Sequence, residues 1–226
     1  RALWHLAPTR ENQLAIAAEG CLPPLVDNLS AEMPLPKWSA AALQALSANC
    51  TENQLALARV GAIAPLSALL GSESEESQLF AQGALLNIAV APENRAPVAK
   101  PLVELLEVRN AAAQMKSAES LAMLASRSAE NRSVIAAALA IPPLVRLLGD
   151  GRMVSTSQVK AAAALGDLAR ASESKQEIVR AGGVEPLVGM LLSSDFDAQT
   201  RASIAVCQLA ASTSAQQLIA DADGIP

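Results

Sequence analysis

Apolar and polar residues follow a pattern that repeats about every 40 residues along the chain. The phrase Leu22-Pro-Pro-Leu-Val returns in related form at Ile63, Ala99, Ile141 and Val184. A second phrase, with helical spacing of apolar residues, follows the Pro-Leu phrase each time, as in Ala84-Leu-Leu-Asn-Ile-Ala89. A Glu-Asn pair precedes the Pro-Leu phrase, as in Glu52-Asn53. Self-similarity at a fixed period is the signature of a repeat protein. Three phrases per period predict three helices per repeat.

Helix start and stop signals surround these phrases. A hydroxyl residue whose oxygen can cap a short first helix stands before the Glu pairs at Thr51, Ser128 and Ser172. Glycines that suit a left-handed helix end follow at Gly20, Gly61 and Gly182. Proline then opens the second helix, whose first turn needs no amide donor. We expect the paired leucines that end second helices to face inward: Leu69-Leu70, Leu105-Leu106, Leu147-Leu148 and Leu191-Leu192.

One period is short. Asn94 and Pro101 are 7 residues apart, whereas the matching residues of the other repeats are 12 apart. Pro97 also removes an amide donor from this segment, so the first helix of the third repeat should be vestigial. The deletion is either tolerated on the convex side or changes the curvature of the repeat array.

The period, the Pro-Leu-Val-x-Leu-Leu phrase, the Glu-Asn pair before it and the Ala-Leu-x-Asn-Leu-Ala phrase after it resemble the armadillo repeat over essentially the whole chain. HEAT-type repeats are the alternative. The resemblance implies an all-α, right-handed superhelix of about five three-helix repeats, open at both ends. Its third helices would line a concave groove, where family members mostly bind other proteins. The expected units are 9–49, 50–90, 91–127, 128–170 and 171–211, with partial units 1–8 and 212–226. Because both ends are out of phase, we expect a segment of a longer solenoid.

Composition narrows the function classes. The net charge of −5 provides no basic field for phosphates, so nucleic acid is not an expected partner. A single His, no Gly-rich phosphate loop and no paired carboxylates in a plausible cleft argue against an enzyme, a metal site or a cofactor. Three cysteines without a Cys-x-x-Cys motif indicate a reducing compartment, hence an intracellular protein, cytoplasmic or organellar. No apolar run approaches the roughly 20 residues of a membrane helix, and no targeting segment is visible.

Aligning the third helices predicts which side chains face the groove. The column at the Asn87 position reads His5, Ala45, Asn87, Met123, Asp167 and Gln208. Four residues earlier stand Arg1, Ala41, Gly83, Glu119, Ala163 and Ile204. Seven residues earlier stand Trp38, Phe80, Lys116, Lys160 and Arg201. These spacings share one helix face, and Gln44 and Leu86, one residue before the column, complete the candidate set.

The two halves of this surface differ in chemistry. Trp38, Phe80 and Leu86 beside small residues suit an apolar anchor or a helix laid in a groove. The later half is a basic stripe that suits acidic side chains, interrupted by Glu119 and Asp167. It resembles, in weaker form, the stripe by which β-catenin-like members bind extended acidic partners. Alternatively, the aromatic side chains are covered by neighbouring segments and the basic residues only solubilise their helices. No Trp-x-x-x-Asn exists, so the nuclear-signal binding of import adaptors is not expected.

The predicted function is therefore a non-enzymatic scaffold that binds a protein segment along the groove. A structural subunit of a large assembly and a targeting module of a larger enzyme, such as a ubiquitin ligase, are the alternatives. No membrane insertion is expected.

Overall fold

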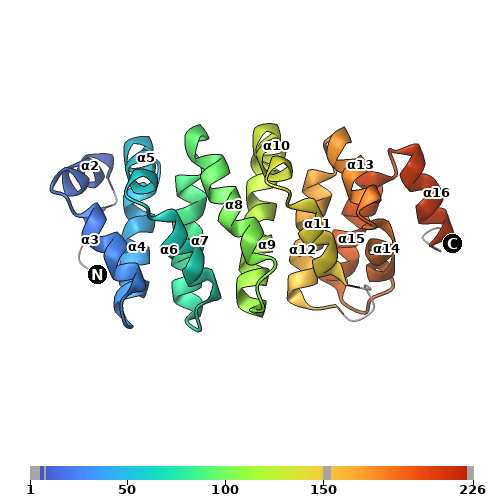
Figure 1. The fold of residues 1–226 in the computed structure, drawn as a ribbon, viewed down its shortest axis with the longest axis horizontal. Helices are drawn as coiled ribbons and strands as arrows, with labels where there is room; N and C mark the ends of the chain where they lie inside the picture. Colours follow the sequence, from blue (N-terminus) through green and yellow to red (C-terminus); the bar gives the residue numbers. More distant parts are fainter. Residues whose placement is uncertain (1–5, 8, 150–153, 223–226) are drawn as a thin grey trace. The chain divides into compact units, whose positions relative to one another are not determined.

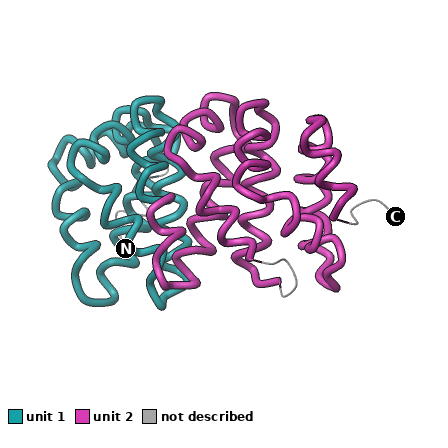
Figure 2. The backbone as a smooth tube through the Cα atoms, turned by 45° about the vertical axis from the view of Figure 1, so that its right-hand side comes forward, with its two compact units in different colours: residues 1–102 teal, residues 103–226 magenta. Residues whose placement is uncertain are grey.

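The computed structural model describes residues 6–7, 9–149 and 154–222, and their regular structure is helical with no strand among them (Figure 1). The chain divides into two compact units, Arg1–Leu102 and Val103–Pro226 (Figure 2). Three helices per repeat recur in both units. The all-α class predicted from the repeating pattern is confirmed.

The first unit holds two complete helix triplets. The first triplet comprises α2 (Arg10–Ala18), α3 (Leu22–Asp27) and α4 (Leu35–Ser47). The second comprises α5 (Thr51–Arg59), α6 (Ile63–Ala68) and α7 (Glu75–Ile88). Short 3₁₀ turns follow as η1 (Asn28–Ser30), η2 (Leu69–Gly71) and η3 (Pro92–Asn94). The third helices α4 and α7 pack side by side, and each also contacts the first and second helices of its own triplet.

The short third repeat is built from one fused helix. The expected first helix is reduced to the 3₁₀ turn η3, and α8 (Arg95–Leu105) then runs through Pro101 without a break. Pro97 lies in the first turn of α8, where no intrahelical donor is needed.

The second unit continues the pattern. Its elements are α9 (Ala111–Arg127), α10 (Ala129–Ala137), α11 (Ile141–Leu148), α12 (Thr156–Leu168), α13 (Ser172–Arg180), α14 (Val184–Leu191), α15 (Phe196–Leu209) and α16 (Thr213–Asp221). The third helix α12 packs against both α9 and α15. A Cβ atom added at Gly166 would lie 3.5 Å from the backbone of Ala205, so α12 and α15 approach closely through small residues.

In three of the four leucine pairs the second leucine is buried as expected, and the first leucine of each pair is half-buried. Leu70, Leu106 and Leu148 are buried. Leu192 is the exception: its side chain is 83% exposed, and the expectation for it was wrong because Leu192, just past the end of α14, lines an open cleft instead of a packed layer.

The capping prediction holds only in part. Ser128 is the N-cap of α10, and its hydroxyl accepts a hydrogen bond from the amide of Asn131. Thr51 and Ser172 are instead the first residues of α5 and α13, whose N-cap residues make no side-chain cap bond. The predicted caps at these two positions were wrong because each helix begins one residue earlier than a hydroxyl cap requires.

The recurring asparagine of the Glu-Asn pair fastens each first helix to the repeat before it. Buried Asn53 donates through Nδ2 to the carbonyls of Leu46 (2.9 Å) and Gln13 (3.1 Å). Asn94 repeats this pattern with Ile88 (3.1 Å) and Gln54 (2.9 Å). The first bond reaches the end of the preceding third helix, and the second reaches the preceding first helix. The first of these bonds satisfies a carbonyl in the last turn of a third helix, which the helix itself leaves unpaired.

Candidate functional site

The aromatic residues predicted for the groove of the first unit are partly exposed. Trp38 on α4 and Phe80 on α7 are both half-buried. The Nζ of Lys37 lies 4.9 Å from the centroid of the Trp38 ring and also pairs with the carboxylate of Glu76 on α7. A cation against an aromatic ring and an ion pair to the next helix fix this corner of the surface. Leu86, in contrast, is 5% exposed and belongs to the core, which leaves little of its side chain for a partner to contact.

Asn87 joins neighbouring third helices. Its Nδ2 donates to the carbonyl of Gln44 (3.0 Å) and to Oγ of Ser47 (3.3 Å), both on α4. The side chain of Gln44 lies over Gly83, where an added Cβ would come within 2.1 Å of its Nε2. Glycine at position 83 therefore makes the room that Gln44 occupies.

A chain of ion pairs runs across the second unit. Glu119 on α9 contacts Lys116 through Oε2 (3.2 Å) and Lys160 of α12 through Oε1 (3.0 Å). On α15, Nε of Arg201 contacts Oδ1 of Asp197 (3.1 Å). Every cation of the predicted basic stripe thus has a carboxylate of its own chain within 3.2 Å. The surface is a row of paired charges.

The position of Lys116 changes its assignment. The residue is 7% exposed, so it is a buried, paired cation with little surface for a partner to contact. Its charge is held inside by Glu119 because an unpaired buried ammonium would be costly. Lys160 and Arg201, at the same position on α12 and α15, retain 30% and 45% of their side-chain exposure.

Asp167 faces three arginines without a direct ion pair among the described side chains. Burial raises the pKa of its carboxyl group, and the charges of Arg170, Arg132 and Arg201 act in the opposite direction. Desolvation is the larger effect, so the carboxyl group holds its proton to a higher pH than an exposed aspartate would.

Apolar side chains lie among these charges. Met123 on α9 is 43% exposed and Ile204 on α15 is 48% exposed, while Gln208 is half-buried. His5 and Arg1, the first members of their columns, lie outside the described residues. The aligned columns of α9, α12 and α15 therefore combine charged and apolar groups that solvent or another molecule can reach.

Two residues that contact members of the columns, one in each unit, escaped the sequence reasoning. Lys37 and Asp197 fall outside the three columns, although each pairs with or packs on a member of them. For Asp197 the signal was present, since it stands four residues before Arg201 on one helix face. The pairing of Lys37 with Glu76 on α7 depends on how two helices are staggered, which periodicity does not provide.

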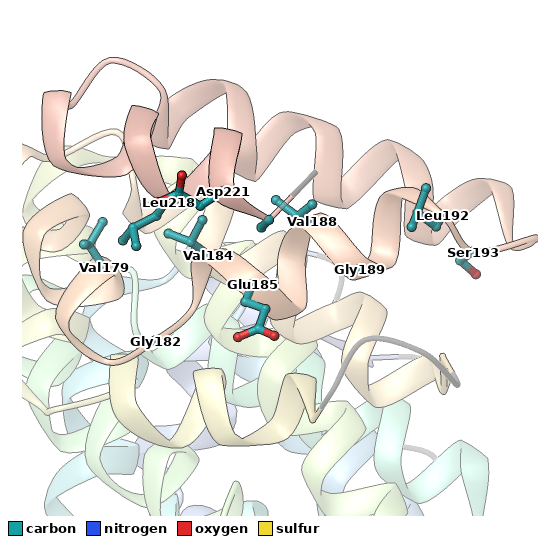
Figure 3. Close-up of a pocket in the computed structure, with 11 residues that line it drawn as sticks. Val179, Gly182, Val184, Glu185, Val188, Gly189, Leu192, Ser193, Leu218 and Asp221 are labelled. Atoms are coloured by element: carbon teal, nitrogen blue, oxygen red, sulfur yellow. The ribbon is translucent and has the colours of Figure 1, made fainter. Parts of the chain in front are cut away.

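A separate cleft lies at the helices α13, α14 and α16 of the second unit (Figure 3). It has a volume of about 790 Å³ and an apolar lining with two carboxylates; its principal residues are Val184, Glu185, Val188, Leu192, Leu218 and Asp221. In Figure 3, Val184 and Val188 lie on α14 and Leu192 just past its end, and Leu218 and Asp221 are contributed by α16.

Within the described ranges, no group of three or more His, Cys, Asp or Glu side chains could hold a metal ion. No single helix among those described has the length and apolar composition to cross a membrane. Two pairs of consecutive helices have the required length and composition only when each pair is taken together, and each pair is sharply bent at the break between its helices.

Comparison with known proteins places these features in a family. The model of the armadillo/beta-catenin-like repeat matches residues 171–211. No curated protein matches the chain. One solved structure, an engineered protein from a structural genomics consortium, is 31% identical, with 93% of this chain and 88% of that chain covered and a TM-score of 0.67.

Two further solved structures carry more descriptive titles. A designed armadillo repeat protein in complex with the peptide (KR)4 is 28% identical, with 92% of this chain and 90% of that chain covered and a TM-score of 0.68. A computationally designed armadillo repeat protein for modular peptide recognition is 26% identical, with 91% and 89% covered and a TM-score of 0.67.

Proposed function

The chain belongs to the armadillo-repeat family, and on that basis we propose that it binds an extended protein segment along its third helices. The observation that carries the proposal is the surface of α9, α12 and α15. There, Met123 and Ile204 are exposed beside the ion pairs of Lys160 and Arg201. An extended segment needs such a mixture: apolar contacts for affinity and charged groups for orientation.

The comparisons support the same role. Structures with designed peptide recognition share the fold at 26% and 28% identity over nine-tenths of the chain. The role needs neither a cofactor nor a catalytic group, because the recognising side chains stand on rigid helices.

A peptide library displayed on phage tests the proposal. Peptides selected on the protein should lose about tenfold in affinity, equivalent to about 1.4 kcal/mol, when Ile204 is replaced by Glu, because the substitution puts a charge at an exposed apolar contact. Leu139→Glu is the matched control, since Leu139 is 67% exposed at the turn between α10 and α11 and outside the three columns. Equal loss in both variants, or failure to select any peptide, would refute binding along the third helices.

A structural subunit of a larger assembly is the second candidate function. The cleft at α13, α14 and α16 favours it, because Leu192 and Leu218 expose apolar surface beside Val188. Apolar surface of this kind is typical of permanent interfaces. Co-purification with a partner at fixed stoichiometry, resistant to high salt, distinguishes this role from reversible peptide binding. The targeting-module alternative stays a prediction from the sequence.

A further inference from the structure

Glu119 occupies the place that a ligand carboxylate would take. Its two oxygens contact ammonium groups on two different helices, Lys116 at 3.2 Å and Lys160 at 3.0 Å. An acidic side chain arriving from a partner would seek the same nitrogen atoms. Within residues 103–226, Lys116 and Lys160 are therefore already paired with a carboxylate of the chain itself.

The two lysines hold this anion differently. The side chain of Lys116 is 9% exposed, whereas that of Lys160 is 30% exposed. A buried ammonium group needs a permanent counter-ion because removal of its partner leaves an uncompensated charge away from water. A partly exposed ammonium group can exchange one carboxylate for another at little cost, since water compensates while it moves. The contact from Glu119 to Lys116 is therefore structural, and the contact to Lys160 is exchangeable.

The surrounding charges determine which kind of partner segment can displace Glu119 from Lys160. Arg132, Arg170 and Arg201 all act on Asp167 through space, and Arg201 is also paired with Asp197. A lysine-rich or arginine-rich segment would meet repulsion there. Arg201 stands on α15 at the position that Lys160 occupies on α12, and its side chain is 45% exposed.

We infer that Glu119 is a built-in competitor: it holds Lys160 until the carboxylate of an acidic extended segment takes its place, and so it sets the affinity for such segments. The inference rests on the proposed function and adds the class of partner and the residue that opposes its binding. Lys160 is then the cation that changes partner, while Glu119 stays with Lys116.

The probe is a fluorescein-labelled octapeptide of alternating Asp and Glu, and its Kd is measured by anisotropy at low ionic strength. Glu119→Gln keeps a carbonyl oxygen for Lys116 but removes the charge that holds Lys160. We expect its Kd to fall about two- to fivefold, the range of a partly exposed ion pair. Glu173→Gln, which removes the same charge from exposed Glu173 on α13, should leave the Kd unchanged. In a Lys160→Met background, Glu119→Gln should give no gain.

A second measurement follows the exchange without any peptide. Acetic anhydride should acetylate Lys160 faster in Glu119→Gln than in Glu173→Gln, as read by mass spectrometry, with circular dichroism confirming that both variants are folded. An unchanged or raised Kd in Glu119→Gln, a gain that persists with Lys160→Met, or equal acetylation in both variants would overturn the inference. So would failure of the acidic peptide to bind at all. The proposed function would still stand if the phage library yielded other peptides sensitive to Ile204→Glu.

Discussion

Two lysines at equivalent positions of neighbouring third helices show what a single residue contributes. Lys116 is almost completely buried against the carboxylate of Glu119, and Lys160 reaches the same carboxylate from the solvent side. Reversing the charge of Lys116 would place a second carboxylate beside Glu119 inside the protein and would disturb folding. Lys160 and Arg201 are therefore the cations at which binding can be tested separately from stability.

Leu139 takes the place of a glycine. Its φ of 62° matches those of Gly61 (81°) and Gly182 (79°), and its side chain is 67% exposed. The left-handed conformation costs a residue with a Cβ atom about 1–2 kcal/mol. Glycine avoids this cost, but it loses more backbone entropy on folding than leucine does, which offsets part of the gain in stability. We expect Leu139→Gly to raise the free energy of unfolding by about 0.5–1 kcal/mol in urea titrations. Gly61→Ala, with open space around the added Cβ, should lower it; the same sign in both variants would contradict this account.

The stability contribution of Asp167 depends on pH. Because burial raises the pKa of its carboxyl group in the folded state, the folded protein binds this proton more tightly than the unfolded chain does. The contribution is therefore fully present below the ordinary aspartate pKa of about 4 and is lost as pH rises through the folded-state pKa. Asp167→Asn should stabilise the protein at neutral pH by less than about 1 kcal/mol, since solvent screens a half-buried charge.

Urea titrations at neutral pH and at about pH 3.5 measure this difference. The stabilisation of the Asn variant relative to the parent should shrink on acidification. A difference that stays constant or grows would show that desolvation of Asp167 is not its cause.

At the scale of the element, the stacking of helices relies on polar side chains that reach backbone carbonyls. Gln13 donates through Nε2 to the carbonyls of Ala45 (2.9 Å) and Ala48 (3.1 Å) at the end of α4, and Gln54 donates to the carbonyl of Ser47 (2.9 Å). Together with the recurring asparagines, these amides tie each first helix to a third helix. Apolar packing fills the space between helices, and the amides fix how far one helix slides along another.

Removing one of these amides should have a clear cost. Asn53→Ala deletes two buried hydrogen bonds and leaves the carbonyls of Gln13 and Leu46 without that donor. We expect a loss of about 2–3 kcal/mol in unfolding free energy, because unsatisfied buried groups are expensive. Asn12 provides the matched control: it is exposed and its side chain donates one hydrogen bond, to Leu6 (2.8 Å), so Asn12→Ala should cost less than 1 kcal/mol. Similar losses in thermal and urea unfolding of both variants would argue against the asparagine as a fastening between repeats.

For the whole molecule, the sequence predicted those features of the fold that depend on the periodic spacing of apolar residues. The all-α class, the three helices per repeat and the side chains that share a third-helix face follow from spacing along one chain. The state of each charge does not, because it depends on the stagger between helices: Lys116 and Lys160 look equivalent in the alignment but differ in burial. Leu192 illustrates the same limit: Leu106 and Leu192 both follow the last residue of their helices, yet Leu106 is buried and Leu192 is exposed.

The asparagine fastening also explains where this protein tolerates insertions and deletions. Each asparagine lies six or seven residues after the third-helix carbonyl that it contacts, in all four repeats that have one. The spacing between the second prolines of successive repeats, in contrast, varies from 36 to 43 residues. Length variation therefore accumulates outside the third-helix to asparagine segment. That segment acts as a connector of fixed length. Engineered insertions and deletions should therefore be placed outside it.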